Sequence, residues 1–484
     1  MLSRPLRTGT YHYALRRAAL NGVGALLCAA LLALAGCAQQ SRMMGRSSSE
    51  GGGTDDAPSG PPNIVLLFAD DLGYGDLSSF GHPTIQTPTL DRLGREGIKL
   101  TSFYAAAPGC TPSRAALLTG RYAGRTGVWS VIFPDQNAGL PAEEVTIAEA
   151  LPEAYRTQMV GKWHLGHKRE EYLPTSQGFD EFFGLPYSND MKRPWVQTDI
   201  PIPLLRGDGE VVEEPVDLSS LTPRYTEEAV GFVREAAASE DPFFLYMAYN
   251  MPHLPLGAPD RFRGKSKAGF YGDVVEMMDW SAAQIMDELE RQGVAENTIV
   301  IFTSDNGPWS NMPDRMVKDD VRRWHAGTSG PLRGAKGQTY DGGLRVPAVI
   351  RWPAQIPEEQ MSAAPTSTLD LLPTLMAATG GEVPDDRPID GHNLLPLLRG
   401  EVDESPREQF SYYQGHQLEA VREGPWKLRV EQTQSGPQPP ELYNLNADPG
   451  ERYNRADEFP EKVEQLKDEM RELSRSINGT TLAF

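Results

Sequence analysis

The chain has few cysteines, no long apolar run and no excess of basic residues. Its 484 residues include three cysteines, Cys28, Cys37 and Cys110. Cys28 and Cys37 belong to the N-terminal segment, so no pair is left for a disulfide framework in the rest of the chain. The apolar run at residues 22–35 is too short for a membrane-spanning helix. The formal net charge of -20 excludes a general nucleic-acid binder, which needs a basic surface.

The composition is that of a soluble globular protein with a sizeable core. Charged residues make up 23% of the chain and hydrophobic residues 39%. A length of 484 residues predicts two or three domains. We interpret the acidity as a solvated surface, so an anionic substrate would need a local positive pocket.

The N-terminus is typical of a targeting segment. Two arginines precede the apolar run, which ends in Leu-Ala-Gly-Cys37. This pattern resembles a bacterial lipoprotein signal, with residues 1–36 removed and Cys37 lipidated; an ordinary cleaved signal peptide is the alternative. Residues 37–60 then form a flexible tether. Because Ala38 is not aspartate, we expect an exported lipoprotein in the periplasm or anchored to the outer membrane.

Strands and helices alternate over residues 61–384, which predicts a doubly wound α/β sheet between helices. We expect strands at residues 63–68, 99–104, 156–160, 243–249, 298–303 and 346–351. We expect helices at residues 89–97, 145–151, 224–239, 271–292 and 366–380. Residues 385–484 have short strand-like runs and a last amphipathic helix at 461–477, which predicts a smaller α+β domain.

The stretch 108–120 has the most distinctive local pattern. Cys110 lies in a loop rich in glycine and proline, and Thr111 followed by Pro112 predicts a helix start with Thr111 as the N-cap. Cys110 would then lie at a helix N-terminus, which favours negative charge, with Arg114 close by. A thiol in that place is activated or modified; a small buried free cysteine is the alternative.

Polar side chains follow two of the predicted strands. Asp70 and Asp71 come after the strand at 63–68, and Asp305 and Asn306 come after the strand at 298–303. Ligand sites of open α/β sheets lie at the carboxyl ends of strands. Four oxygen donors there suit Ca²⁺ or Mg²⁺ and not zinc. The alternative is that both pairs are ordinary turns.

The sequence Cys110-Thr-Pro-Ser-Arg114, followed by Ala-Ala-Leu-Leu-Thr-Gly, resembles the signature of the type I sulfatases. The resemblance is to the arylsulfatase A-like members of the alkaline phosphatase superfamily, and it implies their mixed α/β fold. It also implies that a separate formylglycine-generating enzyme oxidises Cys110 to Cα-formylglycine. Hydrated to a diol, this residue would be the nucleophile that attacks sulfur.

Other segments resemble further sulfatase motifs, in the expected order over about residues 62–350. They are Asp70-Asp71, Gly161-Lys162-Trp-His164, Pro252-His253, Ser304-Asp305-Asn306-Gly and Gly334-Ala-Lys336-Gly. A segment at 186–190 resembles an active-site segment of arylsulfatase A-like members and makes Ser188 a candidate substrate-binding residue. Asn189 stands where that segment has a histidine.

The resemblance implies a role for each matched residue. The metal, Ca²⁺ or otherwise Mg²⁺, would be held by Asp70, Asp71, Cys110 in its modified form, Asp305 and Asn306. Arg114 would stabilise the deprotonated diol, while Lys162 and Lys336 would bind sulfate oxygens. His253 would be the general acid toward the leaving oxygen, and His164 the base for sulfate release.

These features predict a sulfuric ester hydrolase that acts on a sulfate ester through a divalent metal, and we expect a carbohydrate sulfate as the natural substrate. Two alternatives remain open. One is a phosphonate or phosphate ester hydrolase of the same superfamily. The other is a lipoprotein that binds sulfated glycans without turnover. Substrate specificity is expected in the loops 186–222 and 308–331.

Overall fold

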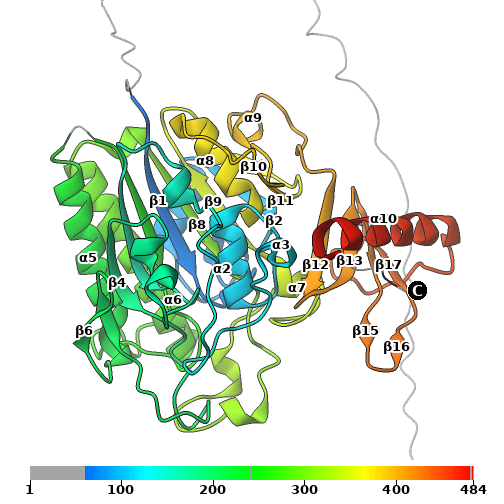
Figure 1. The fold of residues 1–484 in the computed structure, drawn as a ribbon, viewed down its shortest axis with the longest axis horizontal. Coiled ribbons are helices and arrows are strands. Elements are labelled where there is room, and N and C mark those ends of the chain that lie inside the picture. The colour runs from blue at the N-terminus through cyan, green and yellow to red at the C-terminus, as the bar shows by residue number, and fades with distance from the viewer. Residues whose placement is uncertain (1–59, 240, 480–481, 483–484) are drawn as a thin grey trace, which may run out of the picture. The chain divides into compact units, whose positions relative to one another are not determined.

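A computed structural model describes residues 60–239, 241–479 and 482 of the chain. The predicted signal peptide, almost all of the tether and Cys37 therefore lie outside the described residues. Within the described part, strands and helices alternate from residue 63 onward, as the sequence predicts (Figure 1).

The main sheet is mixed and has eleven strands in the order β10-β2-β9-β8-β1-β7-β3-β4-β5-β6, with β11 beside β2. The strands β8, β1, β7, β3 and β4 are parallel to one another, and antiparallel pairs flank them on both sides. Their bounds are β1 Asn63–Ala69, β2 Ile98–Tyr104, β3 Arg156–Lys162, β4 Glu181–Leu185, β5 Leu204–Arg206, β6 Glu210–Glu213, β7 Phe243–Ala248, β8 Thr298–Ser304, β9 Arg345–Arg351, β10 Gln360–Ser362 and β11 Thr366–Ser367.

Helices cover both faces of this sheet, which explains why the central strands are continuous apolar runs. Val65 and Leu67 of β1 belong to a core shared with α1, α5 and α6, and Ile64, Leu66 and Phe68 belong to a core shared with α2, α4, α8 and α9. The helices are α1 Pro88–Arg95, α2 Cys110–Thr119, α3 Ala123–Thr126, α4 Ile147–Ala150, α5 Leu221–Ala236, α6 Gly269–Arg291, α7 Asp341–Leu344, α8 Leu371–Thr379 and α9 Leu395–Leu398. The predicted doubly wound fold is confirmed.

The site is positioned by the neighbours of β1. This strand lies between β7 and β8, parallel to both, so the residues that follow the three strands meet at one edge of the sheet. Backbone hydrogen bonds join the following loops: the N–H of Asp70 donates to Met251 O (3.1 Å), and the N–H of Asp305 donates to Ala69 O (3.1 Å).

The C-terminal part is built on a separate antiparallel sheet of four strands, in the order β12-β13-β14-β17. Its elements are β12 Gln409–Gln414, β13 Gln417–Glu423, β14 Trp426–Arg429, β17 Glu441–Asn444, the small pair β15 Gln432–Thr433 and β16 Gly436–Pro437, and α10 Pro460–Asn478. Leu466 and Met470 of α10 share a buried core with Val421 and Leu428 of the sheet (Figure 1). The predicted α+β domain is confirmed, while its boundary at residue 385 stays a prediction.

Two predictions of secondary structure were inexact. The helix expected over 366–380 begins at Leu371, because Thr366 and Ser367 pair with the edge of β2. The strands β4, β5 and β6 were not predicted. Short 3-10 turns complete the fold: η1 Ser78–Phe80, η2 Glu170–Tyr172, η3 Pro174–Ser176, η4 Leu218–Ser220, η5 Ala295–Asn297, η6 Asp314–Met316, η7 Arg323–His325 and η8 Thr368–Asp370.

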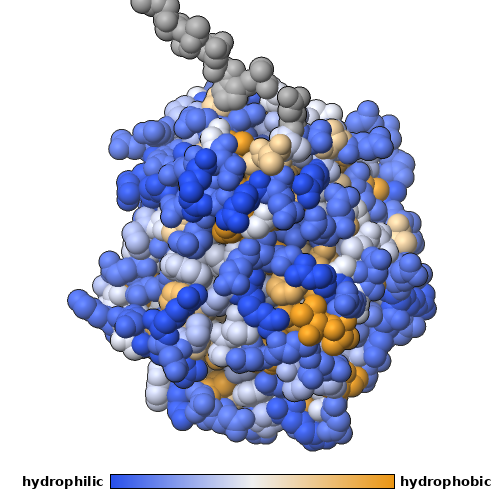
Figure 2. Space-filling model, turned by 90° about the vertical axis from the view of Figure 1, so that its left-hand side faces the viewer, coloured by the Kyte–Doolittle hydropathy of each residue, from blue (hydrophilic) through white to orange (hydrophobic). Residues whose placement is uncertain are grey.

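The surface agrees with the acidic composition. Figure 2 shows a face that is mostly hydrophilic, with apolar side chains gathered in small patches. Among the described residues, no helix combines the length and the apolar character needed to cross a bilayer.

Candidate active site

Cys110 lies at the start of a helix, as predicted, but the cap differs from the prediction. Helix α2 begins at Cys110, and its N-cap is Gly109, not Thr111. Gly109 is extended and its carbonyl accepts the first helical hydrogen bond, from Ser113 N–H (3.1 Å). Thr111 instead lies inside the first turn, where its hydroxyl accepts from Ile132 N–H. The Cys110 side chain is therefore in the first turn, and only 2% of the residue is exposed.

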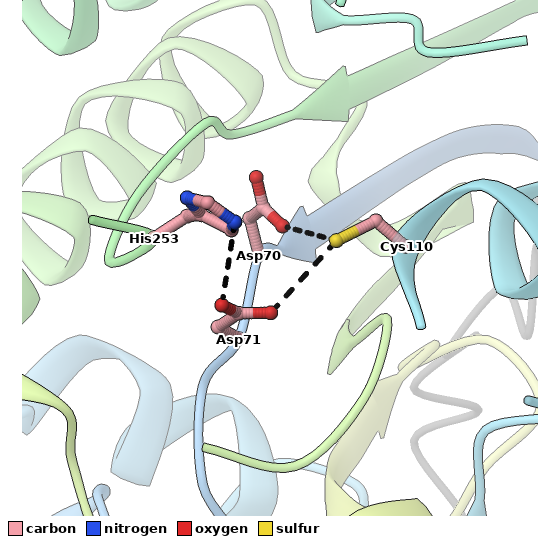
Figure 3. Close-up of side chains that lie close together, drawn as sticks. All are labelled: Asp70, Asp71, Cys110 and His253. Carbon is pink, nitrogen blue, oxygen red and sulfur yellow. Dashed lines mark hydrogen bonds and ion pairs between the residues drawn. The ribbon is translucent and has the colours of Figure 1, made fainter. Parts of the chain in front are cut away.

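Two aspartates and a histidine surround the Cys110 sulfur (Figure 3). Its Sγ lies 3.4 Å from Asp70 Oδ1 and 3.9 Å from Asp71 Oδ1, and His253 Nε2 lies 3.5 Å from Asp71 Oδ2. Asp71 has a left-handed φ of 66°, which is rare for a residue with a side chain and is characteristic of functional sites. Its N–H donates to Asp305 Oδ1 (3.0 Å), which holds this conformation.

Each buried carboxylate of the site has a cationic partner. Arg114 donates through Nε and Nη2 to Asp305 Oδ2 (3.2 and 3.0 Å). Lys162 Nζ donates to Asp70 Oδ2 (2.6 Å). These charges come from β3, α2 and the loops after β1 and β8, so the four segments are fixed relative to one another.

Lys336 is the third cation, and it contacts the nucleophile position directly. Its Nζ donates to Asp71 Oδ2 (2.9 Å) and to Cys110 Sγ (3.2 Å). Burial strongly opposes the charge of Asp70, but Lys162 and the other nearby positive groups outweigh it and hold the pKa of Asp70 well below its usual value.

The cysteine itself is not an activated thiolate. Burial raises the pKa of the Cys110 thiol well above its usual value, and the opposing charges of Lys162 and Lys336 do not overcome this effect. Of the two functional states predicted for Cys110, activation of the thiol by its surroundings is therefore disfavoured.

The two histidines predicted in the site present different ring nitrogens. His164 also has a left-handed φ, 62°, and its Nε2 donates to Ile132 O (3.1 Å). Its Nδ1 is therefore an unprotonated acceptor, and it is buried with no hydrogen-bond partner among the described residues. Burial and the charge of Lys162 lower the pKa of His164 well below its usual value. In His253 the roles are reversed: Nδ1 donates to Leu254 O (2.6 Å), which leaves Nε2 facing the carboxylates.

The structure also brings Ser188 into the site. Lys162 Nζ donates to Ser188 Oγ (3.2 Å). The neighbouring Asn189, which stands where the resembling segment has histidine, donates to the carbonyls of His253 (3.1 Å) and Pro255 (2.9 Å). Asn189 therefore braces the loop that carries His253.

Sequence reasoning did not single out Trp309. Its ring lies 4.7 Å from Lys336 Nζ and 5.5 Å, between centroids, from the ring of His253. The only signal in the sequence was its place in the loop 308–331, where specificity was expected. Its half-exposed indole adjoins Lys336, predicted to bind sulfate oxygens, and His253, predicted to be the general acid.

The residues fit a divalent cation. Asp70, Asp71, Cys110 and His253 each offer a ligand atom within 4.8 Å of the others. The amide of Asn306 donates to Asp71 Oδ1 (2.7 Å), and its own Oδ1 is buried without a partner in the part of the chain that the structure describes. With sulfur and imidazole as ligands the set would suit zinc, whereas the carboxylate and amide oxygens suit a hard cation. The predicted set has Asp305 and Asn306 in place of His253, and an oxygen at position 110 would make that set uniformly hard.

The fold and the site together define a hydrolase of the alkaline phosphatase-like class. A family model described as Sulfatase matches residues 62–381, and one described as N-sulphoglucosamine sulphohydrolase, C-terminal, matches residues 335–476. The chain belongs to the sulfatase family, and it is an enzyme that hydrolyses sulfate esters. Membership generally implies a metal and a formylglycine residue.

Individual relatives cover most of the chain. It is 40% identical to arylsulfatase A of Homo sapiens over 452 residues (84% of this chain and 86% of the relative). It is 42% identical to N-acetylgalactosamine-6-sulfatase of Sus scrofa over 400 residues (78% and 73%). Among solved structures it is similar to Ps i-CgsB in complex with k-i-k-neocarrahexaose, with 30% identity, a TM-score of 0.74 and coverage of 87% and 95%.

Metal binding can be tested without an activity assay. We expect about one divalent ion per chain. Ca²⁺ added to chelator-treated protein should raise its melting temperature, because a ligand at a hundredfold excess over Kd increases the free energy of unfolding by about 2.7 kcal/mol. Asp71→Asn should lose this shift. Asp76→Asn should keep it, because Asp76 is equally buried in the same loop but bonds to Gly73, Tyr271 and Thr328. Stoichiometric zinc in the purified protein, or no shift in wild type, would contradict the assignment.

Proposed function

We propose that this sulfatase hydrolyses a sulfate monoester with a modified residue 110 as the nucleophile. The observation that carries the proposal is the position of Cys110: a buried, neutral side chain at a helix N-terminus, in contact with Asp70, Asp71 and Lys336. In the overall reaction water cleaves the bond between sulfur and the ester oxygen, and the products are an alcohol or phenol and inorganic sulfate.

Two groups beyond the encoded side chains complete the chemistry. Formylglycine, formed from Cys110 by a formylglycine-generating enzyme, supplies when hydrated one hydroxyl for attack on sulfur and a second hydroxyl through which sulfate is released. A divalent ion, Ca²⁺ by resemblance or otherwise Mg²⁺, supplies a Lewis acid, with Asp70, Asp71, Asp305, Asn306 and residue 110 as its ligands.

The three buried cations then act on the anionic groups. Arg114, fixed on Asp305, stabilises negative charge at position 110. Lys162 is paired with Asp70, and Lys336 is paired with Asp71. Both lysines become available to sulfate oxygens once those carboxylates hold a cation. Their positive charge then offsets the charge that develops on the sulfuryl oxygens in the transition state.

The histidines supply proton transfer. His253 acts as the general acid in its imidazolium form: its Nδ1–H stays on Leu254 O, and its Nε2–H is transferred to the leaving oxygen. Burial lowers the pKa of His253, and the Asp71 carboxylate, 3.5 Å from Nε2, opposes this shift and favours the imidazolium. His164 accepts a proton at Nδ1, the nitrogen left without a partner, and so acts as the base for sulfate release. Ser188, bonded to Lys162, contributes to substrate binding.

A carbohydrate sulfate is the substrate class that we favour. Two similar proteins support it: N-acetylgalactosamine-6-sulfatase, and Ps i-CgsB, whose structure was solved in complex with k-i-k-neocarrahexaose. A phosphonate or phosphate ester hydrolase remains the alternative within the superfamily. We do not favour a lipoprotein that only binds sulfated glycans, because Lys162, His253 and Lys336 contact the carboxylates beside Cys110.

We further propose that the protein is exported and anchored by lipid on Cys37. The support is the lipobox-like Leu-Ala-Gly-Cys37 and the absence of aspartate at Ala38. Cells that express the protein should incorporate a fatty-acid probe into it, and Cys37→Ala should abolish the label while Cys28→Ala leaves the lipobox intact and retains it. A label that persists in Cys37→Ala would refute the anchor.

Dependence on residue 110 tests the proposed function. We expect activity on a nitrophenyl sulfate to rise in proportion to the aldehyde found at residue 110 by peptide mass spectrometry. Cys110→Ser should lower turnover by at least about 10³-fold, because a single hydroxyl cannot release the sulfate. Full sulfate release by protein that carries only the thiol would overturn the mechanism. Faster hydrolysis of phosphonate esters than of every sulfate ester would instead support the alternative.

The role of His253 predicts a dependence on the leaving group. His253→Ala should lower kcat/KM by about 10²–10⁴-fold for a sugar sulfate, but far less for a nitrophenyl sulfate, whose phenolate leaves without a proton. His392→Ala removes a histidine outside the cluster and should affect neither substrate. Equal losses on both substrates in His253→Ala would remove it as the acid.

A further inference from the structure

The segment at residues 332–344 joins the active site to the C-terminal sheet. Lys336 near its start contacts Asp71 and Cys110, as described above. Its end is α7, Asp341–Leu344, which lies beside the strands of the C-terminal domain (Figure 1). A change at either end can therefore reach the other through a short piece of backbone.

At the active-site end, the segment is fixed by backbone contacts. Gly337 N–H donates to Pro108 O (2.8 Å), two residues before the nucleophile position. Gly307, which follows the proposed metal ligand at 306, donates from N–H to Gly343 O (2.9 Å). A Cβ at Gly307 would lie 1.9 Å from Gly342 O, so these two backbones are in direct contact.

At the other end, buried charges hold α7 on the C-terminal domain. Lys427 Nζ of β14 lies 2.9 Å from Asp341 Oδ1 and 2.8 Å from Glu451 Oε1. Asp341 N–H donates to Glu451 Oε2 (2.7 Å), and the hydroxyls of Tyr104 and Tyr412 donate to the Asp341 carboxylate (2.8 and 3.1 Å). We call Asp341, Lys427 and Glu451 the clamp.

A second set of contacts lies beside the clamp. The ring of Tyr340 is between two guanidinium groups, 3.9 Å from that of Arg333 and 4.2 Å from that of Arg429. The Tyr340 hydroxyl donates to Glu441 Oε2 (2.8 Å) and accepts from Arg429 Nη1 (3.0 Å). Tyr340 and Asp341 are adjacent, so side chains of the C-terminal sheet bond to two consecutive residues of the segment.

The clamp attaches one domain to another at a high cost in desolvation free energy. All three side chains are fully buried, and buried ion pairs seldom stabilise more than apolar residues of the same shape would. Their directional bonds do, however, fix the backbone of α7 in one position. That position determines where Gly343 meets the loop of Gly307 and where Lys336 reaches the nucleophile.

We propose that Lys427, through Asp341 and Glu451, is a positioning residue for Lys336, so that the C-terminal domain completes the sulfate-binding site. This inference rests on the proposed function of Lys336. Lys427 does not approach the reacting atoms; it acts by holding the segment 332–344 in register with Cys110 and the loop after β8.

A matched pair of variants separates positioning from simple loss of stability. Lys427→Met removes the clamp cation. Arg407→Met removes the cation of another buried ion pair, with Asp370, which also connects the C-terminal part to the sheet domain but does not contact residues 332–344. Tyr340→Phe, which removes one hydroxyl and keeps the ring, is a milder third variant in case Lys427→Met does not fold.

Hydrogen exchange gives a readout that needs no activity. In full-length protein we expect amides of residues 332–344 to exchange at least about tenfold faster in Lys427→Met, and to a lesser extent in Tyr340→Phe. Arg407→Met should leave that segment unchanged even if its melting temperature falls by the same amount. Equal exchange of the segment in all variants and wild type would overturn the proposal.

Kinetics test whether the effect passes through Lys336. A misplaced binding group can lower kcat/KM by about 10²-fold, so we expect a loss of that order in Lys427→Met on an aryl sulfate. In a Lys336→Ala background the same change should add less than about twofold, because its target is gone. A full additional loss would mean that Lys427 acts elsewhere. If wild type, with residue 110 converted, hydrolyses no sulfate ester, the proposed function fails, while the exchange comparison still decides the clamp.

Discussion

Mutual neutralisation of buried charges is the constraint on which the active site depends. The carboxylates that follow β1 and β8 lie close together and are almost completely buried. Such groups are tolerated only if opposite charges meet them. Because the partners come from α2, β3 and the segment after residue 331, the pairing fixes these three segments and the ends of β1 and β8 at once. The left-handed backbone of Asp71 persists because its N–H is bonded to Asp305, one of these paired carboxylates.

Much of the fold could be predicted from the sequence because its central strands are buried on both faces. Runs such as that of β1 are continuous and apolar, and helices of ordinary length separate them. The strands β5 and β6 lack this signal, since they lie at the edge of the sheet, are three and four residues long, and leave β6 mostly exposed. The helix expected from Thr366 begins later, because pairing with β2 overrides the local helical pattern.

The site residues likewise divide into those with a local signal in the sequence and those without one. Asp70, Asp71, Asp305 and Asn306 were predictable because each follows a recognisable strand, and the resemblance to sulfatases supplied the lysines and histidines. Cys110 was correctly predicted at a helix start. The N-cap is Gly109 and not Thr111, because the extended backbone ends at Gly109 and the helix begins at Cys110. The partner of Asp341 could not be predicted, since Lys427 is 86 residues away and nothing in its own strand marks it.

The two family matches overlap over residues 335–381, so the boundary between matched regions does not fall between the domains. The contact of Gly307 with Gly342 leaves no room for a side chain. The same helix, α7, carries Asp341, which bonds to Lys427 and Glu451 of the C-terminal part. For evolution, this means that the C-terminal domain is not a freely exchangeable module. A chimera that takes its C-terminal domain from another sulfatase would need the donor's segment 332–344 as well, so that both halves of the interface are inherited together.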